Sequence, residues 1–231
     1  MKQDIIILQT AKVSLVIQII AAIIGIYGIT LQLPLQHIIL REVLVLETVV
    51  QCIELIYYIW LINQFANINY NVTSTRYFDW VLSTPIMFIT TAIFMTYRNH
   101  LGDSSTLSLF SFLRENANDL FQIVGANAMM LLFGYLGEIE IISRFQGFFW
   151  GSLFFIISFL LLFSHFVGDD GLNQKLFWFM AIIWGFYGVA YCLNYKTKNV
   201  MYNFLDIFSK NFYGFFLFYY IYQISRETPS S

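Results

Sequence analysis

Residues 76–85 read Arg-Tyr-Phe-Asp-Trp-Val-Leu-Ser-Thr-Pro and stand at the start of a long apolar segment. Within this stretch, Arg76, Asp79 and Ser83 are separated by three and four residues, so a helix places them on one face. An ionisable group inside a membrane span costs about 2.5–3.5 kcal/mol at the helix centre on insertion scales. Charges in this position therefore indicate a functional site on a membrane-embedded helix.

The composition of the whole chain is that of a membrane protein. Of its 231 residues, 58% are hydrophobic and only 11% are charged, whereas roughly 25% is usual for a soluble domain. Hydropathy predicts seven spans of the length that a bilayer requires, at residues 10–31, 43–63, 77–96, 118–136, 145–165, 173–195 and 199–223. The predicted fold is an all-α seven-transmembrane helix bundle that forms a single domain over residues 1–231.

Charge and cysteine content argue against several function classes. The net charge is −2 and no run of Lys and Arg forms a nucleic-acid surface. Cys52 and Cys192 fall inside apolar segments, where a thiol behaves as a small hydrophobe, and no zinc spacing exists. We expect a multi-pass integral membrane protein that is not an enzyme and whose main partner is the lipid bilayer. Lys and Arg divide equally between the two sets of loops, so they do not orient the chain.

The last predicted span contains the most unusual charge. Lys210 lies near its middle, too deep for its stem to reach either interface. Asp206 precedes it by four residues, on the same helical face and within reach of a side-chain pair. A structural salt bridge is the alternative, but such a bridge is often no gain over hydrophobic packing. We favour a functional lysine, because a buried lysine is also the group that forms imines.

Arg76 needs partners of its own. A helix N-terminus favours a carboxylate over a guanidinium, so this side chain must be held by groups elsewhere in the bundle. Asp79 and Asp206 are the partners that the sequence predicts.

Three motifs together resemble the signature of the microbial (type 1) rhodopsins. They are Arg-Tyr-x-Asp-Trp-x-x-Ser-Thr-Pro at 76–85, Trp-Gly-Phe-Tyr at 184–187 and Asp-x-x-x-Lys at 206–210. The family's usual proline after the tyrosine of the second motif is Gly188 here. In the fourth span, Asn127, Met130 and Gly134 resemble the positions that touch the retinal ring and polyene. The resemblance covers essentially the whole chain.

This resemblance implies all-trans retinal, bound covalently to Lys210 as a protonated Schiff base. The counter-ion and proton-acceptor group would comprise Asp79, Asp206, Arg76 and Ser83, with Arg76 toward the extracellular side. The rest of the implied retinal pocket is Trp80, Thr84, Met130, Gly134, Trp184, Tyr187 and Tyr191. A protonated imine in an apolar pocket needs a carboxylate, and flat aromatic walls restrict which double bond isomerises.

Thr90 stands where the proton-pumping members of this family carry a carboxylic acid, eleven residues after Asp79. Eleven residues correspond to three turns on the same face, or about 16 Å along the helix. A threonine hydroxyl cannot act as a proton donor near neutral pH, and the third span has no other acid beyond Asp79. The sequence therefore argues against efficient pumping.

The second span carries Glu47 and Glu54, seven residues apart and so on one helical face. Two inward-facing carboxyl groups would line a cation path. The structural alternatives are interfacial exposure, which suits Glu42 near the start of the span better than Glu47, and a neutral, hydrogen-bonded Glu54. Together with Asn203, Asn211 and Ser14, these residues resemble the rhodopsins of giant algal viruses, a group that includes light-gated cation channels.

The function that we expect is a light-gated cation channel for monovalent cations or protons, in a host-cell or viral membrane. An outward proton pump is the first alternative, with Asp79 accepting the proton and Glu54 or water slowly returning one. A sensory photoreceptor is the second, disfavoured because the segment after the last span, residues 226–231, is short. Assembly into a homo-oligomer is left open.

Overall fold

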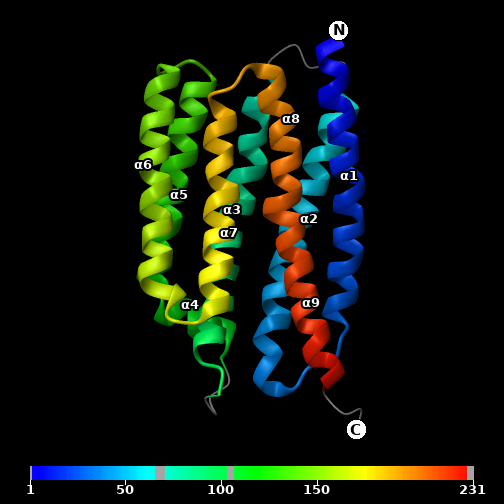
Figure 1. Cartoon of the computed structure of the whole chain (residues 1–231), viewed down its shortest axis with the longest axis vertical. Coiled ribbons are helices and arrows are strands. Elements are labelled where there is room, and N and C mark those ends of the chain that lie inside the picture. Colours follow the sequence, from blue (N-terminus) through cyan, green and yellow to red (C-terminus); the bar gives the residue numbers. More distant parts are fainter. Residues whose placement is uncertain (1, 66–70, 103–106, 228–231) are drawn as a thin grey trace.

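The computed structural model describes residues 2–65, 71–102 and 107–227, and all the regular structure in these ranges is helical. Seven helical columns run side by side along the long axis of the molecule (Figure 1). The first six are α1 (Lys2–Ile29), α2 (Ile38–Gln64), α3 (Val72–Asn99), α5 (Ala117–Glu138), α6 (Arg144–Leu162) and α7 (Gly171–Tyr191). The seventh is continuous through α8 (Tyr195–Asp206), the π-helical turn η3 (Ile207–Asn211) and α9 (Phe212–Glu227). This is the predicted seven-helix bundle.

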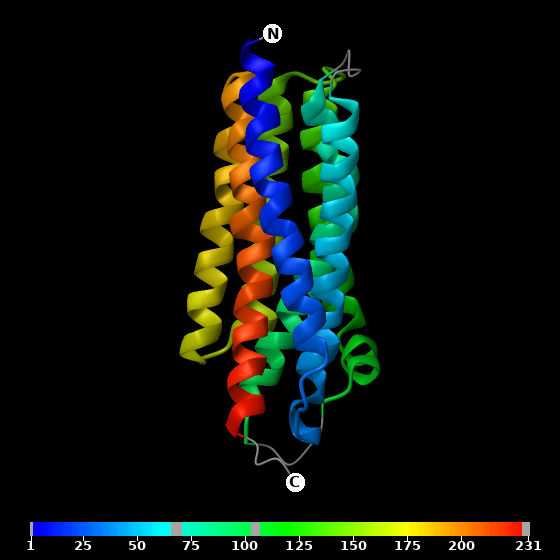
Figure 2. The same ribbon diagram turned by 90° about the vertical axis from the view of Figure 1, so that its right-hand side faces the viewer.

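Three short elements complete the described chain. They are η1 (Leu35–His37), α4 (Leu109–Glu115) and the π-helical turn η2 (Phe163–Val167), which continues α6. The α4 helix lies at the side of the bundle, near the end that carries the C-terminus (Figure 2). The N-terminus is at the opposite end, as an odd number of crossings requires.

The outer surface of the bundle is apolar. Five helical segments within the described ranges are long and apolar enough to cross a membrane: Ile5–Ile29, Leu35–Gln64, Val72–Asn99, Ala117–Glu138 and Arg144–Val167. Large side chains such as Val16, Ile23 and Phe78 are more than half exposed along these helices. Apolar area on this scale marks a surface that contacts lipid or other protein, and the length of the helices favours lipid. The last column, α8–η3–α9, carries buried polar side chains such as Asn203, Lys210 and Asn211.

Several predicted boundaries were wrong by four or more residues, among them the starts of the second and third spans, expected at 43 and 77 where α2 and α3 begin at Ile38 and Val72. The first span was expected at 10–31, but α1 begins at Lys2, since hydropathy detects the apolar part of a helix and not its extension beyond it. The sixth span was expected to reach residue 195, but α7 ends at Tyr191. Asn194 is the N-cap of the next helix, α8, and its side chain accepts from the backbone N–H of Thr197 at 3.0 Å. Because an N-cap residue has a non-helical backbone, α7 cannot continue through it.

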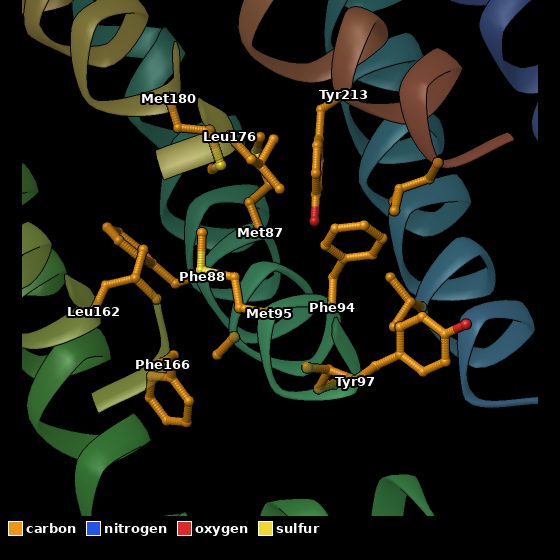
Figure 3. Packing of buried hydrophobic residues seen from close by; sticks show 14 of the residues in the cluster. Met87, Phe88, Phe94, Met95, Tyr97, Leu162, Phe166, Leu176, Met180 and Tyr213 are labelled. Carbon is orange, nitrogen blue, oxygen red and sulfur yellow. The ribbon is translucent and has the colours of Figure 1, made fainter. Parts of the chain in front are cut away.

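The main hydrophobic core lies toward the end of the bundle where α9 finishes. Figure 3 shows its residues gathered around α3. About two thirds of the most apolar α3 window is buried, more than in the other four apolar helices. Met87, Phe88 and Met95 of α3 pack against Leu162 of α6 and Met180 of α7 (Figure 3). This packing fixes α3 as the axis around which the other columns are placed.

A polar cluster closes the bundle beneath this core. Arg98 of α3 forms an ion pair with Asp170 at 2.7 Å and donates a hydrogen bond to the Tyr220 hydroxyl at 2.8 Å. Asp170 also caps α7, because its Oδ1 accepts from the backbone N–H groups of Leu172 and Asn173 at 3.0 and 2.9 Å. One carboxylate thus joins α3 to the start of α7.

We expect Asp170→Asn to lower the free energy of unfolding by about 1 kcal/mol at pH 7, because asparagine keeps the cap but not the ion pair. The hydrogen bond from Arg98 lowers the pKa of Asp170. A carboxyl group whose pKa is lowered by folding stabilises the protein above its unfolded pKa, and this stabilisation disappears as the pH falls through the folded pKa. Thermal unfolding in detergent, followed by circular dichroism, should therefore show a difference between wild type and variant at pH 7 that shrinks below about pH 4. A difference independent of pH would contradict this account.

Candidate functional site

An apolar cavity of about 330 Å³ lies between α3, α5, α6, α7 and the last column. Eight residues that the sequence predicted for a cofactor pocket all line it: Trp80, Thr84, Met130, Gly134, Trp184, Tyr187, Tyr191 and Lys210. Four helical columns thus bring together these eight side chains, which are up to 130 residues apart in the sequence. The cavity presents one amino group within largely apolar and aromatic walls.

Lys210 lies on the π-helical turn η3, and its side chain is only 2% exposed. Its Nζ forms an ion pair with Oδ2 of Asp79 at 2.5 Å. The sequence predicted Asp206 as the lysine's neighbour, at the four-residue spacing of an α-helix. Asp79, which the family resemblance also implied as a counter-ion, makes the ion pair, and within the described residues Lys210 forms none with Asp206. A π-turn closes i to i+5 hydrogen bonds, so residues along it do not keep α-helical spacing. Single π-turns occur frequently at functional sites.

Asp206 is held by hydroxyl groups and by a guanidinium. Tyr58 donates to its Oδ2 and Tyr187 to its Oδ1, each at 2.7 Å. Arg76 Nη1 lies 3.4 Å from Oδ2, and both side chains are fully buried. The carboxylate therefore keeps three donors in place of water, which a buried charge requires.

Arg76 directs its guanidinium toward α8. Its Nη2 donates to Oδ1 of Asn203 at 2.5 Å, and its Nε to Oδ1 of Asn199 at 3.2 Å. In the described part of the chain it forms an ion pair with Asp206 and none with Asp79, so the sequence prediction of two carboxylate partners was half right. The reason is geometric: Asp79 pairs with Lys210, while the arginine, about one turn earlier on α3, reaches the asparagines of α8.

Ser83 and Thr84 support the α3 side of the site through the helix backbone. Ser83 Oγ donates to the Asp79 carbonyl at 2.9 Å, and Thr84 Oγ1 to the Trp80 carbonyl at 2.8 Å. Thr84 also accepts from Asn127 Nδ2 at 2.8 Å, which joins α3 to α5. The Asp79 carboxylate itself keeps one oxygen, Oδ1, without a hydrogen-bond partner among the described residues.

Aromatic rings form the walls on both sides of the cavity. Trp80 meets the rings of Tyr187 and Tyr202 edge-on, with centroids 5.4 and 5.1 Å apart. Trp184 meets Phe88 edge-on at 5.1 Å. Such edge-to-face pairs hold rings in defined orientations. The walls are therefore rigid rather than adaptable.

Two glycines keep the cavity wide on the α7 side. A Cβ atom at Gly185 would meet nothing within 4 Å, and one at Gly188 would meet only Phe148, at 3.8 Å. Gly134 on α5 differs, since a Cβ there would lie 2.7 Å from the Tyr77 hydroxyl. The Gly134 position thus permits close contact between α5 and α3.

Buried polar side chains also occur on α1, α2 and the last column, which contact one another, and we call this set the polar seam. Its members are buried side chains inside apolar helices: Ser14, Gln18, Gln51, Glu54 and Asn211. Gln18 donates to Ser14 at 3.0 Å. Within the described ranges, both carboxyl oxygens of Glu54 and both side-chain polar atoms of Asn211 are buried without a partner, as is Oε1 of each glutamine.

The predicted ion-path residues thus divide into three places. Ser14, Glu54 and Asn211 belong to the polar seam. Asn203 does not, because its amide donates to the Ile7 carbonyl and to Thr10, and its oxygen accepts from Arg76. Glu47 is fully buried and not at the interface, so the exposed alternative for this residue was wrong.

Glu47 accepts a hydrogen bond from the hydroxyl of Thr90. Thr90 is the α3 residue at which the sequence lacked an acid. The structure supplies a carboxyl group there from the facing helix, α2.

Sequence reasoning missed several residues of these networks. Tyr58 and Asn199 both hold the buried charges, and Gln18 and Gln51 belong to the polar seam. A signal existed for each: the glutamines are amides inside apolar spans, Tyr58 lies one turn after Glu54, and Asn199 one turn before Asn203.

Comparison with known proteins was informative at both the sequence and the structure level. The model of the bacteriorhodopsin-like protein family matches residues 9–224. The crystal structure of the viral rhodopsin OLPVRII is similar to this chain with a TM-score of 0.81 and 27% identity, over 94% of this chain and 98% of that one. A search of curated proteins finds no match.

Two more distant structures share the fold. The proton-pumping rhodopsin AR2 from the marine alga Acetabularia acetabulum has a TM-score of 0.74 at 19% identity, over 96% of this chain and 97% of that one. Bromide-bound halorhodopsin from Halobacterium salinarum has a TM-score of 0.75 at 15% identity, over 97% of each chain.

The hydroxyl of Tyr187 provides a test of the buried charge network. Tyr187→Phe keeps the cavity wall but removes one of the donors to Asp206, so we expect a loss of about 1.5–3 kcal/mol in the free energy of unfolding. Tyr219→Phe is the matched control, because Tyr219 is 60% exposed, and its effect should stay within about 0.5 kcal/mol. Thermal unfolding in detergent measures both, and equal losses in the two variants would refute the assigned role.

Proposed function

The chain belongs to the bacteriorhodopsin-like family, and from this premise we propose that it binds retinal at Lys210 and acts as a light-gated cation channel. Membership of the family implies an integral membrane protein with a retinal chromophore. The attachment site, the residue roles and the transport mode are our proposals.

The residues around the cavity fit retinal by their chemistry. A linear polyene aldehyde needs an amino group for attachment and an apolar slot for its chain. Lys210 supplies the amino group, and the cavity is lined mainly by apolar and aromatic side chains. The rings of Trp80 and Trp184 both line the cavity, and flat aromatic faces suit a planar polyene.

Each residue of the site then has a role. Retinal supplies light absorption and isomerisation when bound, and Lys210 holds it as a protonated Schiff base. Asp79, 2.5 Å from the lysine nitrogen, is the nearer counter-ion and the first proton acceptor. Asp206 is the second counter-ion, kept in place by Tyr58 and Tyr187. Met130, Gly134 and Tyr191 would bound the slot.

The observation that carries the channel proposal is the polar seam. Buried polar atoms in proteins are nearly all hydrogen-bonded, and in lipid an unsatisfied group costs several kcal/mol. The seam nevertheless leaves the Glu54 carboxyl and the Asn211 amide without protein partners among the described residues. Such groups are satisfied by water or cations. Polar side chains at membrane depth are tolerated where they line a water-filled route. Asn211 is adjacent to Lys210 in the chain, so a change at the lysine would reach the seam directly.

One observation favours an outward proton pump as a second candidate. Glu47 contacts Thr90 at the depth where an acid is needed to return a proton, about 16 Å along α3 from Asp79. A buried carboxyl group on α2 can serve as that donor although α3 has none. In this candidate Glu47, and not Glu54 or water, performs the reprotonation that the sequence left open.

Removal of the lysine tests retinal attachment. We expect Lys210→Ala, reconstituted with all-trans retinal, to lose visible absorbance completely, because no other lysine lies in the cavity. Wild-type protein prepared in parallel is the control, and circular dichroism verifies that the variant is helical. A coloured variant would show that retinal is held elsewhere.

Two matched substitutions on α2 separate channel from pump. Both Glu54→Gln and Glu47→Gln preserve size and hydrogen bonding but delete a carboxyl group. For a channel, we expect Glu54→Gln to change photocurrent amplitude or cation selectivity severalfold with little change in absorbance, and wild-type current to reverse sign as the voltage is stepped.

For a pump, wild-type current keeps one direction at all voltages. Glu47→Gln then prolongs the deprotonated state at least tenfold in flash photolysis, and azide restores the rate as an external proton carrier. A one-directional wild-type current together with an unchanged Glu54→Gln variant would overturn the channel proposal.

A further inference from the structure

A second buried ion pair lies away from the cavity lysine, near the end of the bundle that carries the N-terminus. Lys198 Nζ lies 2.7 Å from each carboxyl oxygen of Glu138, and both side chains are only 3% exposed. Asn71, the cap of α3, also donates to this carboxylate. Lys198 Nζ is 5.8 Å from the centre of the Tyr191 ring. The pair therefore joins the end of α5, the start of α3 and the first turn of α8.

The residue after Lys198 connects this pair to the buried arginine. Asn199 accepts from Arg76 Nε at 3.2 Å through its side chain and from Nη2 at 3.4 Å through its carbonyl. Its own amide donates to Thr73 on α3 at 2.9 Å. The first turn of α8 thus holds Glu138 on one side and Arg76 on the other.

Energetics indicate what such a pair contributes. Replacing a buried ion pair by apolar residues of similar volume is often neutral or stabilising, so its presence is weak evidence for a role in stability. Removing one partner alone costs about 3–5 kcal/mol, because a buried charge stays uncompensated. The pair does fix the position of the first turn of α8 relative to α5 and α3. Its geometry requires the Lys198 ammonium group and the Asn71 amide to meet the two oxygens of Glu138.

We propose that Glu138 and Lys198 form a positioning clamp, which holds the first turn of α8 so that Asn199 keeps Arg76 against Asp206. This inference rests on the proposed retinal site. Through Arg76, the clamp sets the electrostatic balance of the carboxylates next to Lys210. Glu138 and Lys198 are positioning residues and do not touch the cavity lysine.

The test removes both charges together, in Glu138→Leu/Lys198→Met. We expect this double variant to fold and bind retinal, but with a looser Arg76 and therefore less positive charge near the two aspartates. The visible absorbance change caused by protonation of Asp79 should then move to higher pH by on the order of one unit. Lys196→Met is the matched control, since it removes a positive charge two residues away without breaking the pair, and its titration should match wild type.

Two further variants test the route. Asn199→Ala should reproduce the shift, and adding it to the double variant should add little, because both changes act through the same contact. The Glu138→Gln/Lys198→Met protein, whose glutamine still accepts from Asn71, should shift in the same direction, and it supplies the same readout if the apolar double variant does not fold.

The outcomes distinguish this proposal from the proposed function. A colourless wild-type protein would refute retinal binding itself. A coloured wild type whose titration is unchanged in the double variant, or in which Asn199→Ala and the double variant add fully, would overturn the clamp alone. A Glu138→Gln/Lys198→Met protein that titrates like wild type would also overturn it.

Discussion

Compensation of the Lys210 charge inside an apolar bundle is the constraint on which the rest of the structure depends. An ammonium group at this depth is tolerated only with a carboxylate beside it, and Asp79 occupies that place at 2.5 Å. The carboxylate comes from α3, the most buried of the five apolar helices, so the core packing around Met87 and Phe88 determines where it can stand. The π-turn at residues 207–211 is the local distortion of the last column on which Lys210 is presented to that partner. Stability and site geometry are therefore not separable here.

Compensation then spreads outward in steps. Asp206, the second carboxylate, needs Tyr58, Tyr187 and Arg76. Arg76 in turn needs Asn199 and Asn203 for its remaining N–H groups, because each unsatisfied donor would be costly at this depth. Each side chain that compensates one charge has polar atoms of its own, and these need hydrogen-bond partners on a neighbouring helix. The result is a continuous polar network from the cavity to the end of the bundle, while the exterior stays apolar.

The sequence predicted the parts of this arrangement that depend on composition and spacing. Apolar length predicted the seven columns, and the motifs at 76–85 and 206–210 predicted which side chains would meet. Spacing failed for Lys210, which lies on a π-turn: among the described residues its ion pair is with Asp79, which only the family resemblance implied, and not with Asp206, four residues before it. It also failed for partners on different helices, such as Tyr58 with Asp206, since their distance depends on how columns pack. Hydropathy could not place the start of α1, because helical hydrogen bonding continues past the apolar residues.

The Glu47–Thr90 contact shows that a carboxyl group at the depth of Thr90 can come from α2 as well as from α3. Along α3 alone, Thr90 marks the loss of an acid, and a pump looks excluded. At the α2–α3 interface, Glu47 of α2 places a carboxyl group next to this position, and Thr90 donates a hydrogen bond to it. Glu54, two turns along the same face of α2, differs in having no protein partner among the described residues. A paired acid is suited to hold and release one proton, whereas an unpaired acid in a polar seam is suited to be hydrated and to attract cations. Function therefore depends on which of these two carboxyl groups responds to the change at Lys210, and the seam's direct link through Asn211 favours Glu54.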